Sequence, residues 1–278
     1  MTSMVREEVA RKAAKGGNGR FRNRFANTVA HWQVLVVVVW LGSWELVSRV
    51  GLVDSFWVSR PSAIVPTVID YLGKIDGWKA IKTTTYESLV GLAIGTVLGV
   101  ATGVIMTRSQ TLHRTLNPFV AIMNSTPRLA LTPLFILWFG IDSSSKIVMV
   151  VALVYFVLLV DTISGIEDVD QDLVVVTRLL GASRREVTMR VIVPSIIPWI
   201  LSGLRFSMGL AFSGDVVAEM IAGNGGLGFQ VSYSAGVLDL NGVFAAVVLV
   251  MLLAYIADLL LRQAERRILK WRPSGLRV

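Results

Sequence analysis

The sequence contains no cysteine and only two histidines among its 278 residues. Without cysteine the chain has neither a disulfide nor a thiolate metal site, and His31 and His113 are too isolated to build a metal site. A nucleophile paired with a base and a Walker nucleotide-binding motif are also missing. We therefore expect a non-catalytic chain with no metal site and no cofactor.

Charged residues are scarce as well, at 17% of the chain against about a quarter in a soluble domain of this length. Hydrophobic residues make up 54% of the chain. They are concentrated in stretches of about 18–22 residues that are nearly free of charge, the length that a helix needs to cross ~30 Å of hydrocarbon. The composition therefore predicts an all-α, polytopic membrane protein.

Six transmembrane helices are predicted, and Pro127 and Pro133 break the third. Their ranges are 30–50, 86–107, 116–140, 146–164, 196–222 and 242–261. Lysine and arginine indicate the orientation, because cytoplasmic segments carry an excess of them. Nineteen lysine and arginine residues lie in the termini and in the connections on the same side of the predicted membrane as the termini. Six lie in the segments on the opposite side. We expect a multi-pass protein of the bacterial plasma (inner) membrane with both termini in the cytoplasm.

The net charge of +8 follows the same distribution. Basic residues flank the apolar spans without the interleaved aromatics or motifs of a nucleic-acid-binding protein. Membrane lipid is therefore an expected partner and nucleic acid is not. The predicted organisation is a mostly disordered, basic cytoplasmic tail at 1–29, a six-helix transmembrane domain at 30–270 with a cytoplasmic loop at 165–195, and a cytoplasmic tail at 271–278.

This cytoplasmic loop contains more helix signals than a simple connection requires. Asp168 stands at N-cap spacing before a short apolar helix, and Gly181 suits the left-handed position after its end. Ser183 and Glu186 form a capping-box pair for a second helix, which Pro194 is expected to close. The loop is either a folded connection with structural duties alone or a rigid element that docks on a cytoplasmic partner. The candidate docking residues are Gly181, Ala182, Ser183, Arg184, Arg185, Glu186 and Pro194.

The second span has a glycine at every fourth position over four repeats. This spacing places the glycines on one helical stripe, where another backbone can approach closely. Packing within the chain and a dimer seam are both compatible with such a stripe. The stripe consists of Gly91, Gly95, Gly99 and Gly103.

Charged residues inside or near the ends of the spans need a polar environment, because a charge at the bilayer centre costs at least ~2.5–3.5 kcal/mol. They either line a route across the membrane or form structural ion pairs at helix ends. The segment GNGGLG (223–228) follows a span and has no P-loop lysine, which favours an extracellular gate or docking loop for a binding protein over a nucleotide site. A plain flexible turn is the alternative. The candidate route or gate residues are Arg128, Trp138, Arg205, Asp215 and Glu219.

The cytoplasmic loop resembles the "EAA" signature of ABC importer permeases, in which a glycine is followed after nine residues by an aliphatic-x-aliphatic-Pro ending. Gly181, then "ASRREVTMR" and "VIVP", match that spacing. One departure is that Val175, Val176 and Thr177 stand where the signature has Glu-Ala-Ala. Over roughly residues 60–270 the chain is similar to the nitrate/sulfonate/taurine-type permeases, on "TPRLALTPLFILWFGI" (126–141), "SKIVMV" (145–150), "SGIEDVD" (164–170), "LLGAS" (179–183), "PSIIPWILSGLR" (194–205) and "AEMIAGNGGLGF" (218–229).

This resemblance implies the type I ABC importer permease fold and a chain that forms the translocation pathway of an ATP-driven importer. The implied partners are two copies of an ABC ATPase subunit, an extracytoplasmic solute-binding protein and a second copy of this chain in a homodimer. The implied solute is small, such as a sulfonate, nitrate or similar organic anion, although relatives also carry heterocycles and vitamin precursors. The main alternative is a secondary transporter or channel without an ATPase partner, and a membrane scaffold for a cytoplasmic enzyme is a weaker one.

Overall fold

The computed structural model describes residues 18–51 and 58–271, and the side chains of 31–51 and 58–270. Within these residues it contains helices and no strand, which confirms the all-α prediction. The chain divides into two compact units, residues 1–63 and 64–278.

The first unit contains one long helix, α2 (Asn18–Val50), of which residues 31–50 form a candidate span. Residues 18–29, the last part of the tail predicted at 1–29, are therefore helical. Once a helix is nucleated, each added residue contributes a further hydrogen bond, so the helix extends beyond the apolar stretch. The rest of the predicted tail, residues 1–17, lies outside the described residues.

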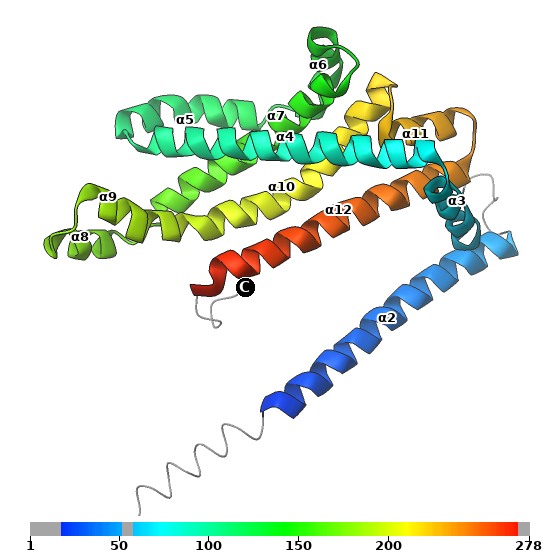
Figure 1. Cartoon of the computed structure of the whole chain (residues 1–278), viewed down its shortest axis with the longest axis horizontal. Coiled ribbons are helices and arrows are strands. Elements are labelled where there is room, and N and C mark those ends of the chain that lie inside the picture. Colours follow the sequence, from blue (N-terminus) through cyan, green and yellow to red (C-terminus); the bar gives the residue numbers. More distant parts are fainter. Residues whose placement is uncertain (1–17, 52–57, 272–278) are drawn as a thin grey trace, which may run out of the picture. The chain divides into compact units, whose positions relative to one another are not determined.

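The second unit is a helical bundle (Figure 1). The α8–α9 hairpin projects from one end of this unit and α11 lies at the other (Figure 1). After α3 (Pro61–Gly73), which begins at the unit boundary, its elements are α4 (Ile75–Thr107), α5 (Gln110–Asn124), the 3-10 turn η1 (Arg128–Leu131), α6 (Thr132–Phe139), α7 (Ser143–Glu167), α8 (Gln171–Leu179), α9 (Arg184–Val187), the π-helical turn η2 (Thr188–Ile192), α10 (Val193–Ala222), α11 (Gly226–Gly236), α12 (Leu240–Ile268) and η3 (Leu269–Trp271).

Among the described residues, five helices are long and apolar enough to cross a membrane, and a sixth crossing is completed if α5 and η1–α6 form one span bent by 78°. The six-span prediction therefore holds with a broken third span. Pro127 lies at the break, as predicted, whereas Pro133 stands in the first turn of α6 and does not interrupt it. Proline is tolerated in a first turn because the N–H that it lacks has no helical partner there.

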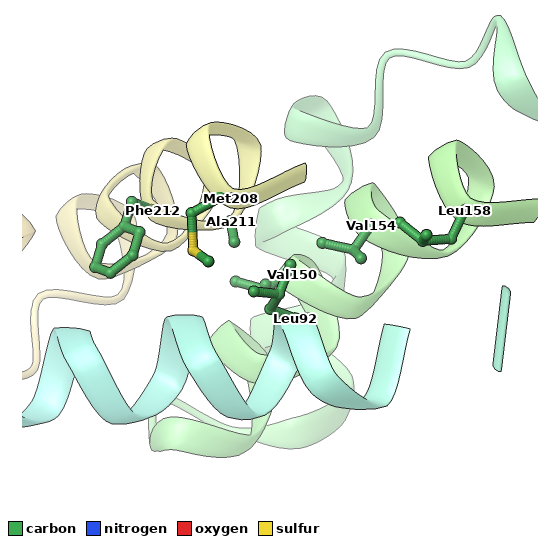
Figure 2. Close-up of a cluster of buried hydrophobic side chains, with 7 residues drawn as sticks. All are labelled: Leu92, Val150, Val154, Leu158, Met208, Ala211 and Phe212. Carbon is green, nitrogen blue, oxygen red and sulfur yellow. The ribbon is translucent and has the colours of Figure 1, made fainter. Parts of the chain in front are cut away.

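The core of the second unit is formed by α4, α7 and α10. Figure 2 shows Leu92 of α4 beside Val150 and Val154 of α7, with Met208 and Phe212 contributed by α10. The glycine stripe of α4 makes this packing close, because α7 lies directly over it. A Cβ added at Gly91 would lie 2.5 Å from the Cβ of Val150, and one added at Gly95 would lie 2.8 Å from that of Val154.

The same close approach continues along the stripe at the other two glycines. A Cβ at Gly99 would lie 2.5 Å from the backbone oxygen of Tyr155, and one at Gly103 would lie 2.8 Å from the Cβ of Thr162. Cβ atoms never approach other atoms so closely, so all four positions require glycine for this helix pair. The stripe therefore packs within the chain, and α7 occupies the face that a dimer seam would need.

Candidate functional site

The loop at 165–195, which the sequence predicts to be cytoplasmic, contains α8, which Asp170 caps at its N-terminus. The Asp170 carboxylate accepts hydrogen bonds from the backbone N–H groups of Asp172 at 2.9 Å and Leu173 at 3.3 Å. The prediction that Asp168 is this cap is wrong. Asp168 ends α7, and its Oδ2 accepts a hydrogen bond from Nε1 of Trp199 at 3.3 Å. The cap is displaced by two residues because α7 continues to Glu167.

Gly181 forms the corner after α8, as predicted. Its φ of +88° lies in the left-handed region that glycine adopts without strain. Its N–H donates to the carbonyl of Arg178 at 2.9 Å, and the N–H of Ala182 donates to that of Thr177 at 3.3 Å. These two bonds make a Schellman motif. No atom lies within 4 Å of a Cβ built on Gly181, so the corner is open to a partner surface.

Ser183 and Glu186 form the predicted capping box of α9. The backbone N–H of Ser183 donates to Oε2 of Glu186 at 2.9 Å, and the N–H of Glu186 donates to Oγ of Ser183 at 3.3 Å. Five buried side chains hold both short helices against the start of α10: Val169, Val174, Val187, Val191 and Ile196. The loop is therefore a folded element with its own small core.

Pro194 does not close the second helix, contrary to the prediction. The helix runs without a break from Arg184 to Ala222, and Pro194 lies inside it. A proline ring in a helix collides with the carbonyl four residues earlier. The π-helical turn at Thr188–Ile192, in which the N–H of Val193 donates to the carbonyl of Thr188, widens the helix immediately before the proline.

A second site is a cluster of charges buried between α4, α7 and α10. Glu87, Asp215 and Glu219 are fully buried and Lys146 is 1% exposed. The Lys146 ammonium lies 3.3 Å from Oε1 of Glu87. One oxygen from each of the three carboxylates lies within 4.8 Å of the others, an arrangement that could hold a metal ion. Asp215 and Glu219 were predicted as route or gate residues, whereas Glu87, Lys146 and a metal site were not predicted.

Hydroxyl and backbone groups orient these carboxylates. Thr84 Oγ1 donates to Oε1 of Glu219 at 2.7 Å, and Ser88 Oγ donates to Oδ2 of Asp215 at 2.8 Å. The N–H of Gly228 donates to Oε2 of Glu219 at 2.6 Å. Every carboxylate of the cluster therefore has a donor on another element of the unit.

The GNGGLG segment covers this cluster. The carbonyl of Asn224 accepts a hydrogen bond from Lys146 Nζ at 2.7 Å, and the N–H of Leu227 donates to Oγ1 of Thr84 at 2.9 Å. Gly226 has a φ of +83°, and a Cβ there would collide with the carboxylate of Glu219. The glycines thus allow the loop backbone to fold directly over the buried acids.

The other predicted route residues lie elsewhere in the second unit. Arg128 faces an open hollow of about 600 Å³, and its guanidinium carbon lies 4.4 Å from the ring centroid of Phe156. Nη2 of Arg128 donates to Oδ1 of Asn124 at 2.8 Å, and Arg128 is half-buried. The hollow is lined by Asn124, Arg128, Phe156, Val157, Val160, Asp161, Ser202, Phe206 and Leu210.

Arg205 and Trp138 belong neither to the buried charge cluster nor to the hollow beside Arg128. Arg205 of α10 forms an ion pair with Glu265 of α12, so it has the structural role that the sequence analysis kept open as an alternative. Trp138 of α6 is 63% exposed and packs beside Phe135, with ring centroids 6.3 Å apart. The sequence analysis missed the pairing of Glu87 with Lys146, although a glutamate within an apolar span was a signal that could have identified it.

Comparison with known proteins identifies the family. The family described as "Binding-protein-dependent transport system inner membrane component" matches residues 95–270. The putative aliphatic sulfonates transport permease protein of Bacillus subtilis (strain 168) is 30% identical over 98% of this chain and 99% of that protein. The protein of the same description from Escherichia coli (strain K12) is 34% identical over 88% and 89%. The taurine transport system permease protein of Escherichia coli (strain K12) is 29% identical over 84% and 87%.

Solved structures support the fold alone, because their identities are low. A chain of an amino acid ABC transporter with histidines has a TM-score of 0.55 at 18% identity, covering 74% of this chain and 97% of that one. An inward-facing methionine ABC transporter has a TM-score of 0.53 at 19% identity, covering 66% and 94%. Both are consistent with the predicted type I ABC importer permease fold.

The matched family decides against a secondary transporter, a channel or a scaffold. Its members work with an extracytoplasmic binding protein and with ATPase subunits that carry out the hydrolysis, so the permease itself is non-catalytic. The apolar helices agree with a multi-pass protein of the inner membrane. The chain belongs to the family of binding-protein-dependent transport system inner membrane components, the membrane-spanning permease subunits of ABC importers.

Proposed function

We propose that this permease carries a small organic anion of the sulfonate type into the cytoplasm. Its relatives include transport permease proteins named for aliphatic sulfonates and for taurine, which supports this substrate class. The hollow beside Arg128 supports it as well, because a guanidinium next to an amide and an aromatic ring suits a sulfonate group. In this proposal Arg128 faces the translocation pathway, whereas Arg205, Asp215 and Glu219 stabilise the helices around it.

The cytoplasmic loop is the proposed coupling element to the ATPase. The observation that carries this proposal is the open Gly181 corner between two capped helices, with a small core beneath it. Ala182, Ser183, Arg184 and Arg185 flank the corner and Glu186 maintains the fold of α9. Pro194 contributes through the continuous helix that joins the loop to α10.

The proposed docking surface of this loop is apolar at the position where the EAA signature has a glutamate. Val175 and Val176 are each 52% exposed, and Leu179 and Leu180 of the same hairpin are more than 80% exposed. Exposed apolar groups of this size gain free energy when a partner removes them from water. The ATPase groove is therefore proposed to be apolar opposite α8 and acidic opposite Arg184 and Arg185.

The proposed orientation places both termini and the coupling loop in the cytoplasm, with the α6–α7 and α10–α11 connections outside. The distribution of lysine and arginine supports it. The proposed organisation keeps a basic tail before the first span, the transmembrane domain to residue 270 and a short cytoplasmic tail at 271–278. One docking loop per chain and paired ATPases favour a homodimer with two ATPase copies.

The test is uptake into proteoliposomes that contain the permease, its ATPase and its binding protein. Gly181→Trp is expected to abolish ATPase association and ATP-dependent sulfonate uptake. Gly140→Trp is the matched control, because Gly140 also has a positive φ of +84° and open space around it but lies on the opposite side of the proposed topology. Equal uptake by the Gly181→Trp variant and wild type would refute the coupling role, and lack of uptake of any sulfonate by wild type would refute the substrate class.

A further inference from the structure

The buried cluster carries more negative charge than its own residues neutralise. Glu87, Asp215 and Glu219 contribute three carboxylates against one ammonium group from Lys146, and none of the four is more than 1% exposed. Its position near the ends of the helices leaves it covered by the backbone of the glycine segment rather than by water. If all three carboxyl groups are ionised, the net charge is −2, which is strongly unfavourable without solvent unless a bound cation or protons neutralise it.

Two carboxylate oxygens of this cluster lack any hydrogen-bond partner. They are Oε2 of Glu87 and Oδ1 of Asp215, and both residues are fully buried. An ionised carboxylate only accepts hydrogen bonds, so each of these oxygens requires a donor or a cation. Both oxygens of Glu219 already accept hydrogen bonds, from Thr84 and from Gly228.

The spacing of the carboxylates suits a calcium-sized ion. Three points no more than 4.8 Å apart lie within a circle of radius at most 4.8/√3, so some position is no more than about 2.8 Å from all three oxygens. Oxygen ligands lie about 2.3–2.6 Å from Ca²⁺ in flexible arrangements of six to eight, whereas Mg²⁺ requires about 2.0–2.1 Å and a near-ideal octahedron. A small inward movement of the carboxylates satisfies Ca²⁺, and a larger one is needed for Mg²⁺.

The surrounding groups resemble the outer shell of a metal site. Ser88 holds Asp215, Thr84 and Gly228 hold Glu219, and Lys146 holds Glu87. Each carboxylate is thereby oriented by a group on another element, which leaves its remaining acceptor capacity for an ion. Lys146 supplies only one of the three positive charges that would neutralise three ionised carboxylates.

We propose that Glu87, Asp215 and Glu219 bind one divalent cation, with Ca²⁺ preferred over Mg²⁺. The ion neutralises the residual charge of −2 and supplies the partner that Glu87 Oε2 and Asp215 Oδ1 lack. It joins α4 to the end of α10, directly beneath the glycine segment that connects α10 to α11. The cation therefore fixes this connection in its folded conformation.

The test uses the purified complex of permease and ATPase, stripped with EGTA and equilibrated with radioactive Ca²⁺. One Ca²⁺ per permease chain is expected, with a higher melting temperature in Ca²⁺ than in EGTA and a smaller rise in Mg²⁺. Ser88→Ala removes an outer-shell group and is expected to lower Ca²⁺ affinity by about 10–100-fold. Asp215→Asn is expected to lower it further, while Asp76→Asn, which changes an exposed acid on α4, leaves it unchanged.

Three outcomes would overturn the proposal. Absence of stoichiometric Ca²⁺ in the wild-type complex would do so, as would equal binding by wild type and the Asp215→Asn and Ser88→Ala variants, which indicates surface acids. The third is a wild-type melting temperature that responds to pH but not to Ca²⁺, since it indicates that protons neutralise the cluster. The wild-type measurements decide the matter even if Asp215→Asn fails to fold, and none of them depends on the transported substrate.

Discussion

Lys146→Met is the most direct probe of the buried charge cluster. The substitution keeps a long unbranched side chain but removes the only cation among the cluster's described side chains. Glu87 then loses the ammonium that lies 3.3 Å from its Oε1 while it remains fully buried. The substitution also removes the hydrogen bond from Lys146 Nζ to the carbonyl of Asn224 at 2.7 Å.

The expected destabilisation follows from this burial. Removing one partner of a buried ion pair costs about 3–5 kcal/mol, because it leaves an uncompensated charge in a low-dielectric environment. In a domain of 150–250 residues, 1 kcal/mol changes the melting temperature by about 2–4 °C. Lys146→Met should therefore lower the melting temperature of the purified complex by on the order of 10 °C, at fixed detergent and Ca²⁺ concentration.

Lys79→Met is the matched control for this substitution. Lys79 also pairs with an acid, Asp76 at 2.9 Å, but the two side chains are 71% and 84% exposed. Exposed pairs contribute little to stability, so this variant should melt close to wild type. Adding Glu87→Gln to Lys146→Met should restore part of the lost stability, which is measured by a double-mutant cycle. The reasoning is refuted if Lys146→Met melts like Lys79→Met, or if Glu87→Gln lowers the stability of the Lys146→Met variant further.

Two further predictions concern the helix pair and the hollow. Gly95→Leu places its Cβ 2.8 Å from that of Val154 and should destabilise the complex by about 1–3 kcal/mol in thermal unfolding. The control Gly209→Leu places its side chain in open space on α10 and should not destabilise the complex. Equal melting temperatures of the two variants would contradict the packing argument. Asp161→Asn should lower uptake of taurine, which carries an ammonium group, by about tenfold and leave uptake of ethanesulfonate unchanged, because Asp161 shares the hollow with Arg128. A parallel loss for both solutes, with the same binding protein, would contradict a direct contact with the ammonium group.

Local spacing was sufficient to predict the glycine corner and the second helix cap of the 165–195 loop, and the glycine stripe. The Gly181 corner and the Ser183–Glu186 box depend on hydrogen bonds between residues no more than five positions apart, so their pattern is visible in the sequence. The stripe depends only on helical periodicity. The sequence could not indicate what the stripe packs against, because that depends on how the helices are arranged.

The charge cluster depends on contacts between distant parts of the chain. Lys146 is 59 residues from Glu87, and Thr84 is 135 residues from Glu219. No periodic pattern links such positions, so the sequence indicated a group of intramembrane charges without its partners.

The prediction for Pro194 was wrong for a different reason. The local rule that proline ends a helix was outweighed, because a π-helical turn accommodates the ring and the helix continues.

The helix that contains Pro194 connects the two sites of the second unit. Its 39 residues, Arg184–Ala222, extend about 58 Å at 1.5 Å per residue, nearly twice the hydrocarbon thickness. One end is fixed to the coupling loop by the small core around Val187, and the other is fixed through Glu219 to α4 and the glycine segment. In the proposed mechanism, a displacement of the loop by the ATPase therefore reaches the α10–α11 connection through a single continuous helix. Bending is expected at the π-helical turn, because the regular ladder of hydrogen bonds is interrupted there, and the buried cluster is expected to resist movement at the far end.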